Sequence, residues 1–133
     1  MAACERGGED RSARGREGER LAALFLQGEG FEILARNHRT ARGEVDLVCR
    51  EGEVLVFVEV RSRSTGAQGG PEETVGRRKA RRVVAAATAW AVANGGLERA
   101  IRFDVVAVTF GDGAPRIALF RAAFDADGRP GHW

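Results

Sequence analysis

Residues 43–61 read Gly-Glu-Val-Asp-Leu-Val-Cys-Arg-Glu-Gly-Glu-Val-Leu-Val-Phe-Val-Glu-Val-Arg. Two apolar runs, residues 43–49 and 54–60, flank the pair Glu51 and Gly52. This arrangement is typical of two β-strands joined by a tight turn. The second run is apolar on both faces, which indicates a central strand of a sheet. The stretch therefore predicts a β-hairpin at the centre of the fold.

Each strand of this hairpin carries a carboxylate within its apolar pattern, Asp46 on the first and Glu59 on the second. A turn at the predicted position places Asp46 opposite Phe57 and puts both acids, with Glu44 and Arg61, on one face of the sheet. Asp46 and Glu59 are then diagonal neighbours, roughly 5–8 Å apart at Cβ. A slip of one residue in the register would place them on opposite faces.

Two interpretations of these acids remain open on spacing alone. In the first, the two carboxylates bind one hard cation such as Mg²⁺, which prefers oxygen ligands and completes its shell with water and phosphate. In the second, the acids form only structural ion pairs on a solvated face, Glu59 with Arg61 and Glu44 with Arg39. Either interpretation supplies the partner that a buried carboxylate needs.

The rest of the chain predicts an α/β domain in the order α-β-β-β-α-β-β, a mixed sheet flanked by helices. We expect one domain at 12–124, between a flexible tail at 1–11 and a C-terminal tail at 125–133. The expected elements are a helix from Ser12, its N-cap, to Gln27, a strand at 31–35 that continues or turns at 37–39, the hairpin, a loop at 62–71, a helix from between Glu72 and Arg77 to Ala93, and strands at 101–110 and 116–120.

Composition limits the function classes only weakly. The chain has 133 residues, of which 44% are hydrophobic and 30% charged, and its net charge is +2. This charge permits nucleic acid as a partner without requiring it. The two cysteines, Cys4 and Cys49, show neither a zinc pattern nor a plausible disulfide, and no apolar run is long enough to span a membrane. The sequence predicts a cytoplasmic protein without a membrane partner.

A basic cluster near the start of the second helix is the main candidate for nucleic-acid contact. Five of the six residues at 77–82 are basic, namely Arg77, Arg78, Lys79, Arg81 and Arg82. Cations at a helix N-terminus oppose the helix dipole, and a bound phosphate would relieve that conflict. We expect the cluster to contact a DNA backbone together with the preceding loop, including Arg63. The alternative is a solvated face paired with Glu72 and Glu73.

Four further residues are assigned no role in the chemistry. Trp90 is expected in the core, since its helical spacing matches Val83 and Ala87. Asp104 and Arg102 are expected to form an ion pair on one strand. His38 is expected to be a surface residue.

The hairpin and its surroundings resemble a known family. The segments that carry the resemblance are residues 16–19, Arg36-Asn37, 43–48, 57–61, Gly70-Pro71, 79–82, Trp90 and 102–106. They are similar to the YraN-like family of small bacterial proteins, which in turn resembles Holliday-junction resolvases of the PD-(D/E)xK nuclease superfamily. The resemblance implies a restriction-endonuclease-like fold and covers most of the chain.

By this resemblance, Asp46 and Glu59 are the metal-binding acids and Val60 lends its carbonyl to Mg²⁺ or Mn²⁺. Glu19 matches a further, helix-borne catalytic acid, and Glu44 would support the ligands or bind a second metal. Arg61 occupies the position of the superfamily's lysine. Arginine cannot give up its proton near neutral pH, so it would stabilise the phosphate and could not act as a base.

The expected function is metal-dependent hydrolysis of DNA phosphodiester bonds, on branched or damaged DNA. A homodimer is possible by the same resemblance. The alternatives are a non-catalytic DNA-binding module on a nuclease fold, and a scaffold whose acids serve only ion pairs.

Overall fold

The computed structural model describes residues 3–65 and 76–131. Within them, the elements follow the order α-β-β-β-α-β-β, which confirms the predicted α/β class. The elements are α1 (Ala3–Gly28), β1 (Glu32–Thr40), β2 (Gly43–Glu51), β3 (Val54–Ser64), α2 (Arg77–Ala93), β4 (Ile101–Phe110) and β5 (Arg116–Phe124).

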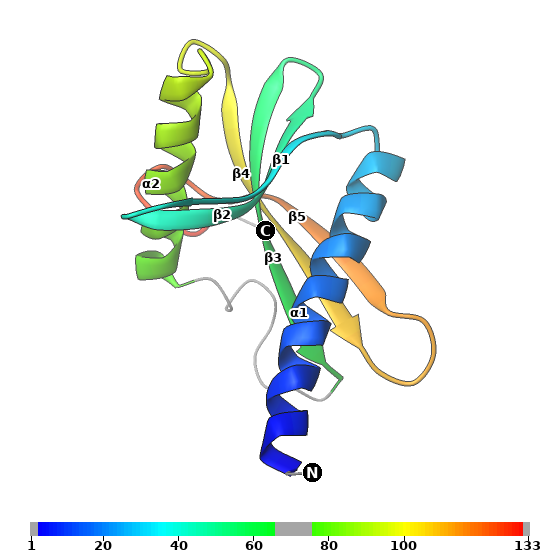
Figure 1. Ribbon diagram of the computed structural model, residues 1–133. Helices are drawn as coiled ribbons and strands as arrows, with labels where there is room; N and C mark the ends of the chain where they lie inside the picture. Colours follow the sequence, from blue (N-terminus) through cyan, green and yellow to red (C-terminus); the bar gives the residue numbers. More distant parts are fainter. Residues whose placement is uncertain (1–2, 66–75, 132–133) are drawn as a thin grey trace.

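The strands form one mixed sheet whose spatial order, β1-β2-β3-β4-β5, is also the chain order. β3 and β4 are parallel and are connected through α2, whereas the other neighbouring strands are antiparallel. The two helices lie on opposite sides of the sheet (Figure 1). In the described part of the chain, no helix has the length and apolar character that crossing a membrane requires.

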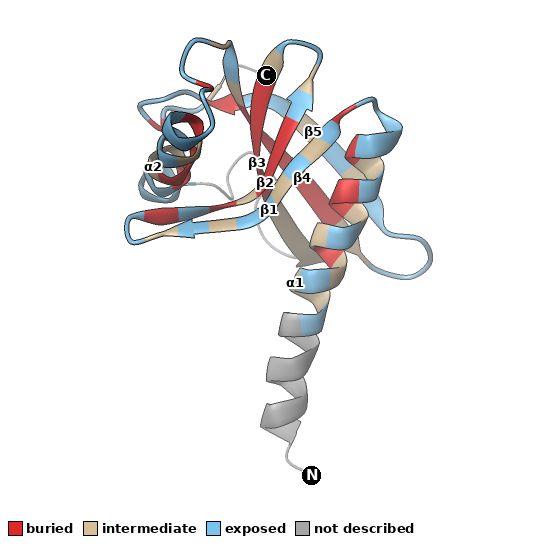
Figure 2. Ribbon diagram, turned by 45° about the horizontal axis from the view of Figure 1, so that its top comes forward, coloured by how far each residue is buried: buried red, intermediate tan, exposed pale blue. Residues whose placement is uncertain are grey.

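The sheet buries an apolar layer on each face. Figure 2 shows buried residues in the strands and in both helices. Alternation along β3 sends Leu55 and Phe57 into the layer shared with α2, while Val56 and Val58 enter the layer shared with α1. This explains why the strand is apolar on both faces. β3 is therefore the central strand that the sequence predicts.

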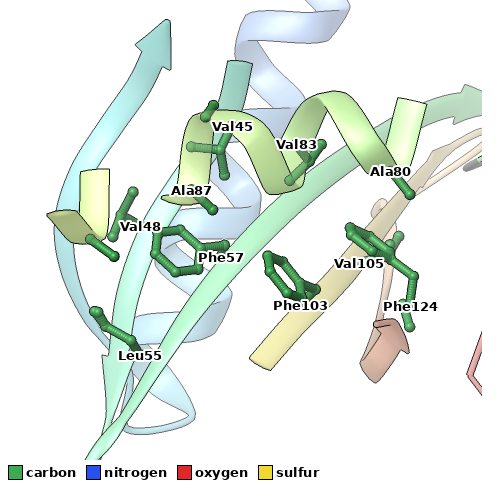
Figure 3. Close-up of a cluster of buried hydrophobic side chains, with 13 residues drawn as sticks. Val45, Val48, Leu55, Phe57, Ala80, Val83, Ala87, Phe103, Val105 and Phe124 are labelled. Carbon is green, nitrogen blue, oxygen red and sulfur yellow. The ribbon is translucent and has the colours of Figure 1, made fainter. Parts of the chain in front are cut away.

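Aromatic rings organise the layer beneath α2 (Figure 3). The Phe57 ring meets Trp90 edge to face at 6.1 Å between centroids and stacks on Phe103 at 5.9 Å. Phe103 stacks in turn on Phe124 at 5.3 Å. Trp90, predicted in the core, is partly buried and packs against the core cluster.

Several predicted boundaries were wrong. α1 begins at Ala3, so Ser12 lies inside the helix and is not its N-cap. β3 continues through Ser64 where a loop was predicted, because its polar end pairs with β4 up to Phe110. The remainder of that predicted loop, residues 66–71, lies outside the described residues. β5 runs beyond the predicted 116–120 to Phe124, whose ring enters the core.

The hairpin turn also differs from the prediction. Glu51 pairs with Val54, so the turn residues are Gly52 and Glu53, and Gly52 adopts a left-handed φ of 60°. Glu51 stays in the strand because its carboxylate forms ion pairs with Arg102 and Arg121.

This turn shifts the register of the hairpin by two residues relative to the prediction. Because side chains alternate with a period of two, the same side chains still share a face. The β2–β3 ladder ends at Leu47 opposite Val58. One step further in the same register, Asp46 comes level with Glu59, whereas the predicted register placed it opposite Phe57. The two acids are therefore nearer to each other than the predicted diagonal arrangement.

Candidate active site

The site lies where β2 separates from β3. On the N-terminal side of Leu47, β2 is no longer paired with β3. The end of the β1–β2 hairpin extends from there toward α2 (Figure 1). Gly43 packs so closely there that a Cβ atom would lie 2.0 Å from the carbonyl oxygen of Arg82. Asp46 and Glu59 stand at the base of this fork, on the diverging strands.

The two acids are held by a short chain of interactions. Val60 donates its backbone N–H to Oδ2 of Asp46 at 2.8 Å. The carboxyl groups of Asp46 and Glu59 are hydrogen-bonded to each other. Glu59 is only 4% exposed, and its Oε1 lies 2.9 Å from Nζ of Lys79 on α2. The partner of Glu59 is therefore Lys79, and the alternative pair of Glu59 with Arg61 does not form.

Burial controls the protonation of this pair. It raises the pKa of Glu59 to about 7, with a further rise from the charge of Asp46 and a smaller opposing effect of Lys79. Burial also raises the pKa of Asp46, against the hydrogen bond from Val60. Two carboxyl groups this close do not both ionise readily without a cation. Each of the two acids therefore holds its proton to a higher pH than a free carboxyl group does while no metal ion is bound.

Glu19 reaches the same region from α1. The helix sits close to β3 at Gly18, where a Cβ atom would lie 1.8 Å from Oγ of Ser62. Glycine there permits the approach that brings Glu19 toward the acid pair. Burial and the charge of Asp46 raise the pKa of Glu19, while a hydrogen bond with the Asn37 side chain lowers it.

Asn37 is a site residue to which sequence reasoning gave no role. It lies on β1 with a left-handed φ of 52°, a conformation that asparagine tolerates better than most residues. Its contact with Glu19 ties that acid to the sheet. An asparagine within a strand was the available signal, since asparagine is depleted in strands.

A pocket of about 410 Å³ opens beside the acids and joins three elements. Its lining residues are Arg14, Gly15 and Glu19 of α1, Val60, Arg61 and Ser62 of β3, and Lys79 of α2. Arg61, half-buried, thus faces the same space as Lys79 and Glu19. The pocket has cationic walls and one carboxyl group, that of Glu19, and Lys79 connects it to the buried Glu59.

The donor set fits a hard divalent cation on chemical grounds. The carboxyl groups of Asp46 and Glu59 lie next to each other, so both could contact one ion. Mg²⁺ commonly uses one or two carboxylates together with water and substrate phosphate. Glu19 does not complete a ready-made cage: across residues 3–65 and 76–131, no group of three or more His, Cys, Asp or Glu is arranged to hold a metal ion. The contact seen for Val60 is through its N–H, which leaves its predicted carbonyl contact a prediction.

The predicted basic cluster divides between two surfaces. Lys79 faces the acid pair, whereas the other members join Arg42 around a second pocket of about 480 Å³. This second pocket, here called the arginine pocket, is lined by Arg42, Arg77, Arg78, Arg81 and Arg82. Sequence reasoning missed Arg42, which the β1–β2 turn carries to α2. Glu72 and Glu73, the proposed alternative partners of the cluster, lie outside the described residues.

Two other predicted site residues lie farther from the chemistry. Glu44 is exposed and forms an ion pair with Arg39 at 3.1 Å between Oε2 and Nε, which confirms that alternative for Glu44. It still acts on the acid pair, since its charge contributes to raising the pKa of Asp46. Arg63 lies half-buried on β3, inside a strand and not on the predicted loop.

The remaining candidates have structural roles. Asp104 is fully buried, and its carboxylate accepts hydrogen bonds from Arg102 at 2.8 and 2.9 Å and from the Ala122 N–H at 3.0 Å. The predicted ion pair is thus confirmed. Cys49 is a buried free cysteine, and burial raises its pKa to about 12. The prediction that His38 is a plain surface residue was wrong: the side chain is half-buried, and its buried Nε2 has no hydrogen-bond partner among the described residues.

Comparison with known proteins places the chain in a family. Residues 18–108 match the model of the uncharacterised protein family UPF0102. A UPF0102 protein of Anaeromyxobacter dehalogenans (strain 2CP-C) is 76% identical over 126 residues, which cover 95% of this chain and 94% of the relative. Relatives in Desulforapulum autotrophicum and Geobacter sulfurreducens are 42% and 44% identical, over 85% and 84% of this chain and 93% and 88% of their own. The chain belongs to the UPF0102 family, the YraN-like family that its sequence resembles.

Proposed function

We propose that this member of the UPF0102 family is a metal-dependent nuclease that hydrolyses DNA phosphodiester bonds. The observation that carries the proposal is the hydrogen-bonded pair of Asp46 and Glu59, two carboxyl groups on adjacent strands beside a pocket lined with cations. Burying two acids against each other is costly unless a cation joins them. Such a pair is a common way to hold a catalytic divalent ion.

The surroundings of the pair favour a phosphate-bearing substrate. Arg14, Arg61 and Lys79 line the pocket, and the N-terminus of α2 begins beside it with no acidic residue in its first turn. Cationic side chains attract phosphate oxygens and bind them through charge-assisted hydrogen bonds. A carbohydrate or peptide substrate would have less use for this concentration of positive charge.

Hydrolysis at this pocket requires one water molecule. Its oxygen forms a bond to phosphorus, the bond from phosphorus to one bridging oxygen breaks, and a proton passes to that leaving oxygen. A bound Mg²⁺ or Mn²⁺ would supply an acidified water and charge neutralisation when present. Asp46 and Glu59 would hold the ion. Glu19, which lines the pocket from α1, would orient the water molecule, and Arg61 would bind the non-bridging phosphate oxygens.

The arginine pocket would extend the binding surface along the nucleic-acid backbone. Four of its five arginines and Lys79 belong to the first turns of α2, so one nucleic-acid strand could contact both surfaces. Affinity built on phosphate contacts falls steeply with salt concentration. Among the described residues of α2, the exposed cations lack interleaved aromatic side chains, so we expect weak sequence preference.

The test is cleavage of a supercoiled plasmid and of a synthetic four-way junction in Mg²⁺ or Mn²⁺. Asp46→Asn and Glu59→Gln should lose at least about 100-fold in rate, as expected when ligands of a catalytic metal are removed. Glu98→Gln, which removes an exposed carboxylate outside the pocket, serves as the matched control. Cleavage that persists in Asp46→Asn would refute the proposal.

A second candidate, a DNA-binding module without turnover, is favoured by one observation. Arg61 stands where the superfamily motif has lysine, while the arginine pocket would bind a DNA backbone without any catalysis. Fluorescence anisotropy with labelled duplex and junction DNA separates the two functions. Salt-sensitive binding that Arg78→Gln weakens, without cleavage in any metal, would favour the second function.

A further inference from the structure

We propose that Lys79 is the lysine of this nuclease centre, delivered from helix α2 in place of the strand position that Arg61 occupies. The proposal rests on the proposed nuclease function and assigns a residue within it. Lys79 neutralises Glu59 while the acid pair holds no metal ion, and it contacts the substrate phosphate once Glu59 is engaged by a cation. It differs in this from its basic neighbours on α2, which we assign to the DNA backbone.

The geometry separates Lys79 from those neighbours. Its Nζ lies 2.9 Å from Oε1 of Glu59, and it lines the same pocket as Glu19, Val60 and Arg61. The arginines on either side line the arginine pocket. The Lys79 side chain is 45% exposed while that of Glu59 is 5% exposed, so the ammonium group sits between a buried carboxylate and open solvent. A phosphate entering the pocket would meet Lys79 without rearrangement of the helix.

Amino-acid usage gives an independent observation. Of the 21 lysines and arginines in the chain, Lys79 is the only lysine. The chain places arginine at every other basic position, including Arg61 beside the acid pair. A chain that uses arginine wherever a cation suffices keeps lysine at one place, where the compact ammonium group meets a buried acid. The guanidinium group of an arginine at position 79 would be planar and bulkier than the ammonium group, so it would contact Glu59 with a different geometry.

The start of α2 gives a further reason for this pairing. Its first turn contains Arg77, Arg78 and Lys79 and no acid, and Gly76 at the N-cap makes no side-chain capping bond. Cations there are unfavourable beside the helix dipole. Glu59 supplies, from β3, the negative charge that the helix itself lacks. When a divalent ion engages Glu59, Lys79, which lines the pocket, loses its carboxylate partner and can bind an anion there.

A single lysine makes the central claim measurable without any cleavage assay. Protein labelled with ¹⁵N-lysine gives one side-chain amino signal, and we expect that signal to shift saturably as Mg²⁺ is added to the full chain. Calorimetry in parallel measures Mg²⁺ binding itself. Asp46→Asn should abolish both the binding and the shift. Mg²⁺ binding that leaves the Lys79 signal unchanged would overturn the proposal.

Substitutions supply the second arm. Lys79→Gln should cut the cleavage rate by at least about 100-fold, as for loss of one preorganised charge at a reacting group. It should bind Mg²⁺ at least as tightly as the parent, by up to about fivefold, because the competing cation is gone. A merely structural lysine would give weaker metal binding together with the lost rate. Arg116→Gln removes an exposed positive charge on β5 and is the control.

Lys79→Arg keeps the charge and guards against a variant that fails to fold. We expect its melting temperature to stay near that of the parent and its cleavage rate to fall by at least about tenfold. Parent-like cleavage by Lys79→Arg or Lys79→Gln would overturn the proposal while the nuclease function stands. If the parent neither binds Mg²⁺ nor cleaves DNA, the nuclease function fails and the role of Lys79 fails with it.

Discussion

Replacing Glu59 with glutamine should stabilise the metal-free protein at alkaline pH. Glu59 is 4% exposed, and burial raises its pKa from 4.5 to about 7. Between these two values the folded state binds more protons than the unfolded state, so stability falls as pH rises. The favourable contribution is complete below about pH 4.5 and is lost as pH rises through about 7. Glutamine has no such dependence.

The size of the effect follows from the two pKa values. At 1.36 kcal/mol per pKa unit, the rise to about 7 corresponds to at most about 3 kcal/mol in the free energy of unfolding at pH 8. The lost ion pair costs little, because Lys79 is half-exposed and can be rehydrated. For a chain of this length, about 3 kcal/mol corresponds to roughly 10 °C in melting temperature.

Urea unfolding in EDTA, from pH 4.5 to pH 8.5, measures this difference through the midpoint at constant slope. Parent and variant should be close in stability at pH 4.5 and should separate steadily up to pH 8. Glu44→Gln removes an exposed carboxylate near the same site and should change stability by less than about 0.5 kcal/mol at any pH. A variant that is less stable than the parent at pH 8, or that keeps its pH slope, would refute the reasoning.

Three further predictions concern packing and burial. Asp104→Ala should cost about 3–5 kcal/mol by urea unfolding, because Arg102 and a backbone N–H lose a fully buried partner, and a cost below about 1 kcal/mol would contradict this. Gly43→Ala should lower stability by about 1–3 kcal/mol through its clash with α2, whereas Gly15→Ala, with no atom within 4 Å of the new Cβ, should raise it by about 0.5–1 kcal/mol, and equal effects would refute the packing argument. The Cys49 thiol, whose pKa burial raises to about 12, should resist a thiol reagent at pH 8 in a Cys4→Ser background and react once urea unfolds the protein.

Much of the fold could be predicted because its strands have strong local patterns. The alternation and apolar runs at β2, β3 and β4 identified those strands, and the predicted end of α2 at Ala93 is confirmed. The pairing of Asp46 with Glu59 also followed from local sequence, since a tight hairpin brings nearby strands into one register. The turn was misplaced by one residue, because Glu51 belongs to the strand through ion pairs with distant arginines.

What could not be predicted depends on contacts between segments far apart in sequence. The partner of Glu59 is Lys79, on a helix whose docking no local pattern specifies. Arg42 joins the arginine pocket only because the β1–β2 turn packs against α2, which the glycine at position 43 permits. Asn37 contacts Glu19 through a left-handed backbone that strand periodicity conceals. Each of these is a tertiary contact made by a lysine, an arginine or an asparagine. Such residues are common on protein surfaces, so their presence in the sequence does not indicate the contact.

The parallel pairing of β3 with β4, through α2, has a consequence for the order of folding. The β1–β2–β3 meander closes short loops and can form early, whereas the β3–α2–β4 crossover closes a long one and is expected to form late. The acids of the site belong to the early part and their ammonium partner to the late part. In this order of events, Asp46 and Glu59 come together before Lys79 reaches Glu59. We expect the rate of the final folding step to fall as pH rises through the titration of this pair, and divalent ions to restore it.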